Sequence, residues 1–265
     1  MSATAPAHFR KPNIRALFRP DPGWLLVDAD LSGADAQVVF AEADEQTTIA
    51  RLRAGAKLHV ETATAFFGER FATAPGDTKN KLTPKGRMYD DCKRGGHAST
   101  YGVRERTLSA SLGLSMKEAG RFRDLYLHEL HPGIGAWQAR VELELRETRT
   151  TANAFGYRVF WFDRIDGLLP EALAWGPQST VAITTYRAAA QLRRAFPFVQ
   201  FLLQVHDSLV FQIPVGERSA LPEIEAALGV DIPYEPALRI PWKLAISTES
   251  WGEAKPWSAN NDGAA

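Results

Sequence analysis

The most constraining feature of this sequence is a pair of apolar segments, far apart in the chain, that each lead into aspartate. The first is Trp24–Asp35 (WLLVDADLSGAD) and the second is Phe201–Gln212 (FLLQVHDSLVFQ). An apolar run that ends in aspartate is typical of a buried strand with a carboxylate at its exposed end. In the second segment His206 and Asp207 interrupt two β-rich runs, as the tip of a hairpin would. Placed side by side, the two segments would bring Asp30 and Asp207 to one divalent metal site.

Such a pair of carboxylates predicts a particular kind of metal chemistry. Carboxylates are hard oxygen ligands of the kind that Mg²⁺ uses, and Mg²⁺ takes its other ligands from water and substrate phosphates. Two Mg²⁺ ions, or Mn²⁺ in their place, would support phosphoryl transfer. Asp28 and Asp30 also have a simpler interpretation, in which both acids end a strand and cap the following helix.

Length and composition exclude several classes of protein. The 265 residues can bury a sizeable core, as one large domain or two smaller ones. No apolar run reaches the roughly 20 residues that cross a bilayer, and the N-terminus lacks the pattern of a secretory signal. The single cysteine, Cys92, excludes an intramolecular disulfide. We therefore expect a cytoplasmic protein without membrane contact.

The formal net charge is zero, but the charges are unevenly distributed. The region from Lys79 to Arg106 contains eight basic residues and only three acids, Asp90, Asp91 and Glu105. A local positive stripe of this kind suits phosphate groups. The alternative interpretation is an ordinary solvated helix face.

The patterning predicts an α/β protein of the α+β type, with an antiparallel sheet carrying the acids and a helical lobe. A capping box at Ser115–Glu118 predicts the start of a helix, and this helix should end before His131. We expect strands or hairpins at 24–31, 150–162, 199–213 and 240–248, and helices at 33–43, 44–54, 58–68, 85–100, 134–149, 169–196 and 217–228.

From about Asn13 to Trp251 the motifs resemble those of the family A DNA polymerases, the DNA polymerase I family, in a phage-like form. Motif A of that family reads Asp-x-Ser-x-x-Glu after an apolar strand, and Asp30–Asp35 (DLSGAD) is similar to it. The resemblance implies that Asp30 is a catalytic metal ligand. It also implies that Asp35 replaces the glutamate that blocks a ribose 2′-hydroxyl, with a side chain one methylene shorter.

The segment Lys93–Gly102 (KRGGHASTYG) resembles motif B, Lys-x-x-x-aromatic-x-x-x-Tyr-Gly, on the family's fingers helix. Spacings of four put Lys93, His97 and Tyr101 on one helix face. The resemblance implies that Lys93 supports the triphosphate and its leaving pyrophosphate, that His97 packs on the sugar and base, and that Tyr101 and Gly102 lie by the templating position. The simpler interpretation is a basic amphipathic helix.

Two further nucleotide-binding residues follow from the resemblance. The family has arginine four residues before the lysine, where this chain has Tyr89, so Arg87 is the candidate substitute. A shift of two residues rotates a side chain by about 200° on a helix. The segment around His59 resembles one whose histidine approaches the incoming triphosphate, and the alternative is a helix N-terminal residue without a ligand.

Motif C of the family reads Val-His-Asp-Glu, and Val205–Ser208 (VHDS) resembles it. The resemblance implies that Asp207 is the second catalytic metal ligand and that His206 lies at the primer terminus. Ser208 lacks the charge of the usual glutamate.

Two DNA-binding residues are implied by weaker similarities. Gly176–Thr180 (GPQST) resembles a segment that opens a long helix, and its Gln178 would contact the minor groove at the primer end. A helix N-cap cluster is the alternative there. Thr151–Arg158 resembles a Thr-x-x-Gly-Arg-x-Arg hairpin and makes Arg158 a DNA-binding candidate.

The resemblance as a whole implies a DNA-templated DNA polymerase module that adds deoxynucleotides to a primer with two Mg²⁺ ions, in a bacterial or phage-infected cell. Its partners would be primer–template DNA and dNTPs. Because little sequence precedes motif A, three interpretations stay open: a separate chain that supplies a thumb or exonuclease, a minimal stand-alone enzyme, and a degenerate fragment. The alternatives are a single-subunit RNA polymerase, a terminal transferase-like enzyme, and a non-catalytic primer–template binding subunit. The implied division is an irregular lead-in at 1–22, palm at 23–70, fingers at 71–150, palm again at 151–257 and a disordered tail at 258–265.

Overall fold

The computed structural model describes residues 13–259, so most of the expected lead-in and most of the expected tail lie outside the described residues. The chain forms two compact units. The sheet unit contains the chain up to Ser32, residues 182–231 and the chain from Arg239, and the helical unit contains residues 33–181 and 232–238. An antiparallel sheet and a helical lobe are therefore confirmed, whereas the division into palm and fingers by residue range stays a prediction.

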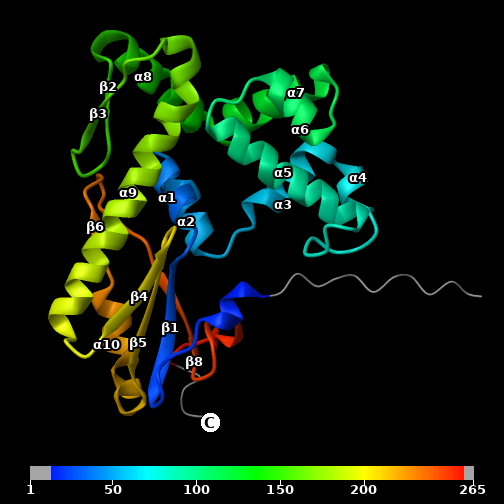
Figure 1. The fold of residues 1–265 in the computed structure, drawn as a ribbon. Helices are drawn as coiled ribbons and strands as arrows, with labels where there is room; N and C mark the ends of the chain where they lie inside the picture. The colour runs from blue at the N-terminus through cyan, green and yellow to red at the C-terminus, as the bar shows by residue number, and fades with distance from the viewer. Residues whose placement is uncertain (1–12, 260–265) are drawn as a thin grey trace, which may run out of the picture. The chain divides into compact units, whose positions relative to one another are not determined.

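A five-stranded antiparallel sheet with the order β4-β5-β1-β8-β9 forms the centre of the sheet unit (Figure 1). Its two longest central strands contain the acidic motifs. The strands are β1 (Trp24–Leu31), β4 (Gln200–Val205), β5 (Ser208–Pro214), β8 (Trp242–Ser247) and β9 (Lys255–Pro256). Two smaller two-stranded sheets are β2 (Thr150–Ala152) with β3 (Arg158–Phe160), and β6 (Asp231–Ile232) with β7 (Leu238–Arg239).

β1 is an inner strand, and its sequence explains why. Leu25, Leu26 and Val27 follow one another and are all buried, so both faces of this strand are covered. A continuous apolar run is what such a strand requires. Only near its C-terminal end does β1 present polar side chains, at Asp28 and at the exposed Asp30.

The helical unit is built from short helices, most of them at the expected places. They are α1 (Ala34–Glu42), α2 (Gln46–Arg53), α3 (Leu58–Phe67), α4 (Glu69–Ala72), α5 (Pro84–Thr100), α6 (Glu105–Leu112), α7 (Met116–Asp124), the π-helix η2 (Leu125–Leu130) and α8 (Pro132–Thr148). The capping box of α7 is confirmed, because Ser115 and Glu118 bond reciprocally. The sequence did not predict α6.

The long helix α9 (Ile165–Ala195) has residues in both units. The sheet unit also contains three 3₁₀ turns, η1 (Ile14–Leu17), η3 (Val215–Ala220) and η4 (Trp251–Glu253), and the helix α10 (Leu221–Ala227). The expected helix over 217–228 is wrong in its first third, because the 3₁₀ turn η3 ends at Ala220 and α10 begins at Leu221. Pro222 lies in the first turn of α10, where its missing N–H leaves no helical hydrogen bond unmade.

Two glycines inside α5 allow this helix to be packed closely. A Cβ atom on Gly95 would lie 2.8 Å from the ring of Phe122, and one on Gly96 would lie 2.9 Å from the ring of Tyr126. Both glycines are buried, so α7 and the π-helix approach the backbone of α5 directly. In residues 13–259 we find no helix with the length and apolarity that crossing a membrane requires.

Candidate active site

The two acidic motifs meet in the sheet unit. β1 pairs with β5 in a register that places Asp30 opposite Ser208. The backbone N–H of Leu31 donates to the carbonyl oxygen of Asp207 at 3.3 Å, so Asp207 lies next to the end of β1. On the other side of β1, Lys243 of β8 is in register with Asp30. The structure therefore brings Asp30 and Asp207 together.

Asp207 lies in the expected hairpin tip. Val205 and Ser208 are paired, so the turn between β4 and β5 consists of His206 and Asp207 alone. His206 has a positive φ of 54°, and the side-chain amide of Gln204 donates to its carbonyl oxygen at 2.7 Å. A residue other than glycine seldom adopts this conformation, and such positions are concentrated at functional sites. The exposed ring of His206 and the carboxylate of Asp207 are thus presented by a tight turn.

Asp30 carries one side-chain contact, in which the Ser208 hydroxyl donates to Asp30 Oδ1 at 2.7 Å. Asp28, two residues earlier on the same strand face, accepts a hydrogen bond from Trp251 Nε1 at 2.7 Å. Burial raises the pKa of the Asp28 carboxyl, although the bond from Trp251 acts in the opposite direction. Burial thus disfavours the charged form of Asp28, and among residues 13–259 its other oxygen has no hydrogen-bond partner.

The donor set fits Mg²⁺ or Mn²⁺. Asp30 and Asp207 supply hard oxygen atoms at an exposed strand end. Within residues 13–259 no cluster of three or more histidine, cysteine or acidic side chains is arranged around a metal position. A site with so few protein ligands is ordinary for Mg²⁺, which is held by one or two carboxylates and by substrate phosphates.

In the helical unit, α5 confirms that the motif B segment is helical. Lys93 and His97 are exposed, and Tyr101 is the buried C-cap residue, whose N–H donates to the carbonyl oxygen of His97. Tyr101 Oη donates to Asp35 Oδ1 at 2.5 Å, and His97 Nδ1 lies 3.9 Å from Asp35 Oδ2. Burial and the charge of Asp35 raise the pKa of Tyr101, so its hydroxyl stays protonated and can donate. Gly102 follows with φ +71°, a conformation that favours glycine.

His59 lies in the first turn of α3 and contacts α5. Its ring meets the ring of Tyr89 edge to face, with the centroids 5.9 Å apart. Burial, followed by the charge of Lys93, lowers the pKa of His59, so the neutral ring is favoured. Arg87 is exposed on α5. Tyr89 thus packs against His59 in place of a cation.

The remaining predicted DNA contacts lie at exposed positions. Arg158 is exposed on β3. Gln178 is exposed in the interior of α9, which begins at Ile165 and continues through Pro177. The N-cap interpretation of this segment is therefore wrong, and the long helix expected at 169–196 is confirmed. The role of Gln178 and Arg158 in DNA binding stays a prediction.

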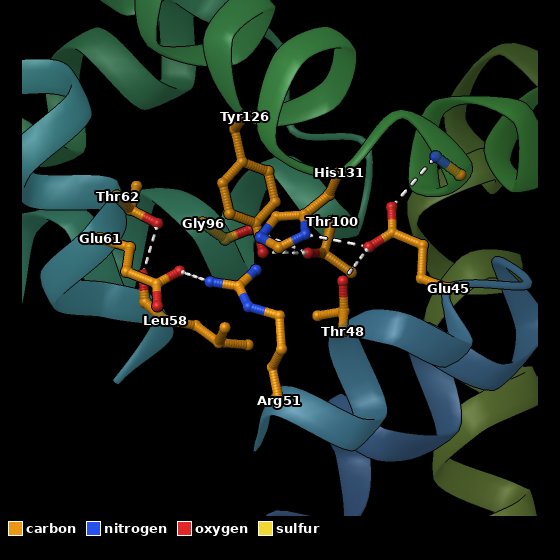
Figure 2. Close-up of polar contacts among 11 residues, drawn as sticks. Glu45, Thr48, Arg51, Leu58, Glu61, Thr62, Gly96, Thr100, Tyr126 and His131 are labelled. Atoms are coloured by element: carbon orange, nitrogen blue, oxygen red, sulfur yellow. Dashed lines mark hydrogen bonds and ion pairs between the residues drawn. The ribbon is translucent and has the colours of Figure 1, made fainter. Parts of the chain in front are cut away.

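A polar cluster that the sequence did not predict lies in the helical unit (Figure 2). Its centre is Glu45, whose Oε2 lies 3.0 Å from Nδ1 of the buried His131 and accepts from Thr48 Oγ1 at 2.9 Å. The N–H of Gly133 donates to Glu45 Oε1 at 3.1 Å. Glu45 and His131 are 86 residues apart, so no local pattern reveals the pair. The Ser208–Asp30 bond was also missed, because it depends on the register between β1 and β5, which brings together residues 178 apart in the chain.

Comparisons with known proteins give a consistent result. Residues 6–253 match the family described as DNA polymerase family A. The thermostable DNA polymerase I of Thermus filiformis is 30% identical over 239 residues, which are 84% of this chain and 27% of that protein. The DNA polymerase of Mycobacterium phage D29 is 29% identical over 208 residues, 78% of this chain and 32% of that protein. The chain thus spans about a quarter to a third of the length of these relatives.

One solved structure supports the fold. It is the POL domain of Pol1 from M. smegmatis in complex with DNA primer-template and dNTP, with a TM-score of 0.74 and 21% identity. The match covers 91% of this chain and 42% of that one. At this identity the likeness concerns the fold.

Proposed function

We propose that this chain, which belongs to DNA polymerase family A, is the catalytic module of a DNA-templated DNA polymerase. Its substrates would be primer–template DNA and dNTPs. The observation that carries this proposal is the meeting of Asp30 and Asp207 at the β1–β5 strand end. A chain that kept only a binding role would have no need of two carboxylates at this strand end.

Asp30 and Asp207 would hold two divalent cations, Mg²⁺ or Mn²⁺. When bound, such ions activate the primer 3′-oxygen and stabilise the charge of the phosphoryl group in transfer. Asp28 is not offered as a ligand, because the Trp251 indole binds it and burial disfavours its charge. His206, in its turn beside Asp207, would contact the primer terminus.

The helical unit would bind the nucleotide. Lys93 has an exposed ammonium group that would support the leaving pyrophosphate. His97 would pack on the sugar and base, and His59 and Arg87 would assist at the triphosphate. Asp35 would limit access to the ribose 2′ position, because the Tyr101 hydroxyl holds its carboxylate in one orientation.

Exposed side chains would make the DNA contacts. Gln178 and Arg158 are exposed and would contact the primer–template duplex, with Gly102 at the templating base. The short side chain of Asp35 favours one alternative, a polymerase that also accepts ribonucleotides.

Primer extension by the full chain tests the proposal. We expect template-dependent addition of dNTPs in the presence of Mg²⁺ or Mn²⁺. Addition without template would favour a terminal transferase, and preferred use of NTPs would favour an RNA polymerase. Binding of primer–template without any addition would contradict the proposal and leave a non-catalytic subunit.

A further inference from the structure

Ser208 is the residue at which the candidate metal site departs most from its family motif. The motif has glutamate after the catalytic aspartate, whereas this chain has a hydroxyl group that carries no charge. Ser208 is the first residue of β5 and is directly opposite Asp30 in the β1–β5 ladder. Its side chain therefore starts from the same sheet face as that of Asp30, at the distance of a cross-strand pair.

The hydroxyl makes a specific contact with the proposed metal ligand. Ser208 Oγ donates to Asp30 Oδ1 at 2.7 Å, a normal length for a hydrogen bond between a hydroxyl and a carboxylate. Among residues 13–259 it is the one side chain that donates to Asp30. Lys243, the neighbour of Asp30 on β8, makes no ion pair with Asp30. The orientation of the Asp30 carboxylate thus depends on a single hydroxyl group.

We infer that Ser208 is a positioning residue for the metal ligand Asp30. By donating to Oδ1, the hydroxyl restricts rotation of the carboxylate and leaves Oδ2 available to a divalent cation. Groups that orient metal ligands in this way contribute substantially to metal affinity. In this chain the task belongs to a neutral donor, where the family motif supplies another negative charge.

This inference rests on the proposed function, because it takes Asp30 as a metal ligand. A merely structural Ser208 is the competing interpretation. The residue begins a strand directly after a tight turn, and its hydrogen bond could serve the pairing of β5 with β1. The two interpretations differ in whether loss of the hydroxyl alone changes metal binding.

A pair of isosteric variants separates them. Ser208→Thr keeps the hydroxyl and Ser208→Val replaces it with a methyl group of similar size. Both residues are β-branched and suit a strand, so effects of shape and strand propensity are matched. The variants should therefore differ only through the donor to Asp30.

The direct readout is the affinity of the full chain for Mn²⁺. It is measured by electron paramagnetic resonance in the absence of DNA and nucleotide. Only the Mn²⁺ binding that is lost in the Asp30→Asn variant is assigned to this site. We expect Ser208→Val to weaken this binding by about 10- to 100-fold and Ser208→Thr to keep the wild-type affinity within about threefold. Equal affinities for the threonine and valine variants would overturn the inference, and so would Mn²⁺ binding that Asp30→Asn leaves unchanged.

Primer extension distinguishes failure of this inference from failure of the proposed function. If wild-type chain extends primers and the two Ser208 variants bind Mn²⁺ equally, the function stands and Ser208 is structural. If wild-type chain adds no nucleotide, the polymerase proposal fails. The Mn²⁺ titration still decides whether Ser208 positions Asp30.

Discussion

Asp30 in the sheet unit and Glu45 in the helical unit are both acids that the fold orients, but they are held in opposite ways. Asp30 is exposed and accepts one side-chain hydrogen bond, from Ser208. The side chain of Glu45 is 11% exposed and has three partners, His131, Thr48 and Gly133. A carboxylate that accepts one hydrogen bond has lone pairs left to bind a cation. A carboxylate whose two oxygens both accept hydrogen bonds from the protein serves to stabilise the fold.

The electrostatics of the two regions agree with this difference. Burial acts to raise the pKa of Glu45, but the contacts with His131, Thr48 and Gly133 outweigh it and hold the pKa below the usual range. Next to Asp30, burial raises the pKa of Asp28, which accepts a side-chain hydrogen bond from Trp251. The helical cluster thus compensates its buried charge with hydrogen bonds. At the β1 strand end Asp30 is exposed, whereas Asp28 is half-buried.

The largest expected effect is on catalysis at the strand end. Asp207→Ala removes one proposed ligand and should lower the rate of nucleotide addition at least about 10³-fold, because metal ions supply several kcal/mol of transition-state stabilisation. Single-turnover primer extension measures the rate, and circular dichroism should show an unchanged fold. If Asp207→Ala keeps a tenth or more of the wild-type rate of nucleotide addition, Asp207 is not a catalytic metal ligand.

The next effect concerns nucleotide binding by α5. Lys93→Met should reduce kcat/KM for dNTP by about 10- to 100-fold, the worth of a charged hydrogen bond to phosphate. Phosphate contacts strengthen as charge moves to the leaving group, so kcat should fall together with a rise in KM.

Lys117→Met is the matched control, since Lys117 is an exposed lysine of α7 outside motif B. Equal losses in the two variants, or a Lys93 effect on DNA affinity alone, would assign Lys93 to the template instead.

A smaller effect, on stability, is expected from the Glu45 cluster. Glu45→Gln places an amide NH₂ group where two donors require an acceptor, and should cost about 1–3 kcal/mol of unfolding free energy. Urea unfolding, with hydrogen exchange in α2 and α8, measures it.

The control is Glu61→Gln, which breaks the Arg51–Glu61 ion pair shown in Figure 2. Both side chains of that pair are more than 40% exposed, so its loss should cost less than about 1 kcal/mol. If Glu45→Gln and Glu61→Gln lower the free energy of unfolding by the same amount, the buried hydrogen bonds of Glu45 do not stabilise the fold more than the exposed ion pair does.

The smallest effect is the pH dependence of the same cluster. A folded-state pKa below the ordinary 4.5 of glutamate contributes stability that is present above pH 4.5 and is lost as the pH falls through the folded-state value. The difference in unfolding free energy between wild type and Glu45→Gln should therefore shrink on acidification. A difference that grows below pH 4.5 would mean that the sign assigned to the Glu45 shift is wrong.

The sheet unit was the easier part to predict from sequence. β1 has the expected bounds because its apolar run, its flanking glycine and its terminal aspartate are all local signals. The two-residue turn at His206 and Asp207 follows from the β-rich runs on either side. The meeting of Asp30 and Asp207 was predicted by supposing the two acidic segments side by side, and the β1–β5 register then places Asp30 opposite Ser208, next to Asp207.

The helical unit was predicted less well, for identifiable reasons. α6 was not predicted, whereas the long helix expected at 169–196 is present as α9, which runs through Pro170 and Pro177. Buried residues on either side, such as Leu173 and Val181, indicate that tertiary packing outweighs the missing backbone donors. The Glu45–His131 contact depends on a fold that joins residues 86 apart, and single-sequence patterns do not contain that information.

The central claim is that Asp30 and Asp207 bind the same divalent metal site. Anomalous X-ray diffraction from crystals of the full chain soaked in Mn²⁺ tests it most directly. We predict an anomalous peak in contact with carboxylate oxygens of both residues, and its absence in crystals of Asp207→Ala. Mn²⁺ bound elsewhere, or bound by Asp30 with Asp207 turned away, would contradict the claim.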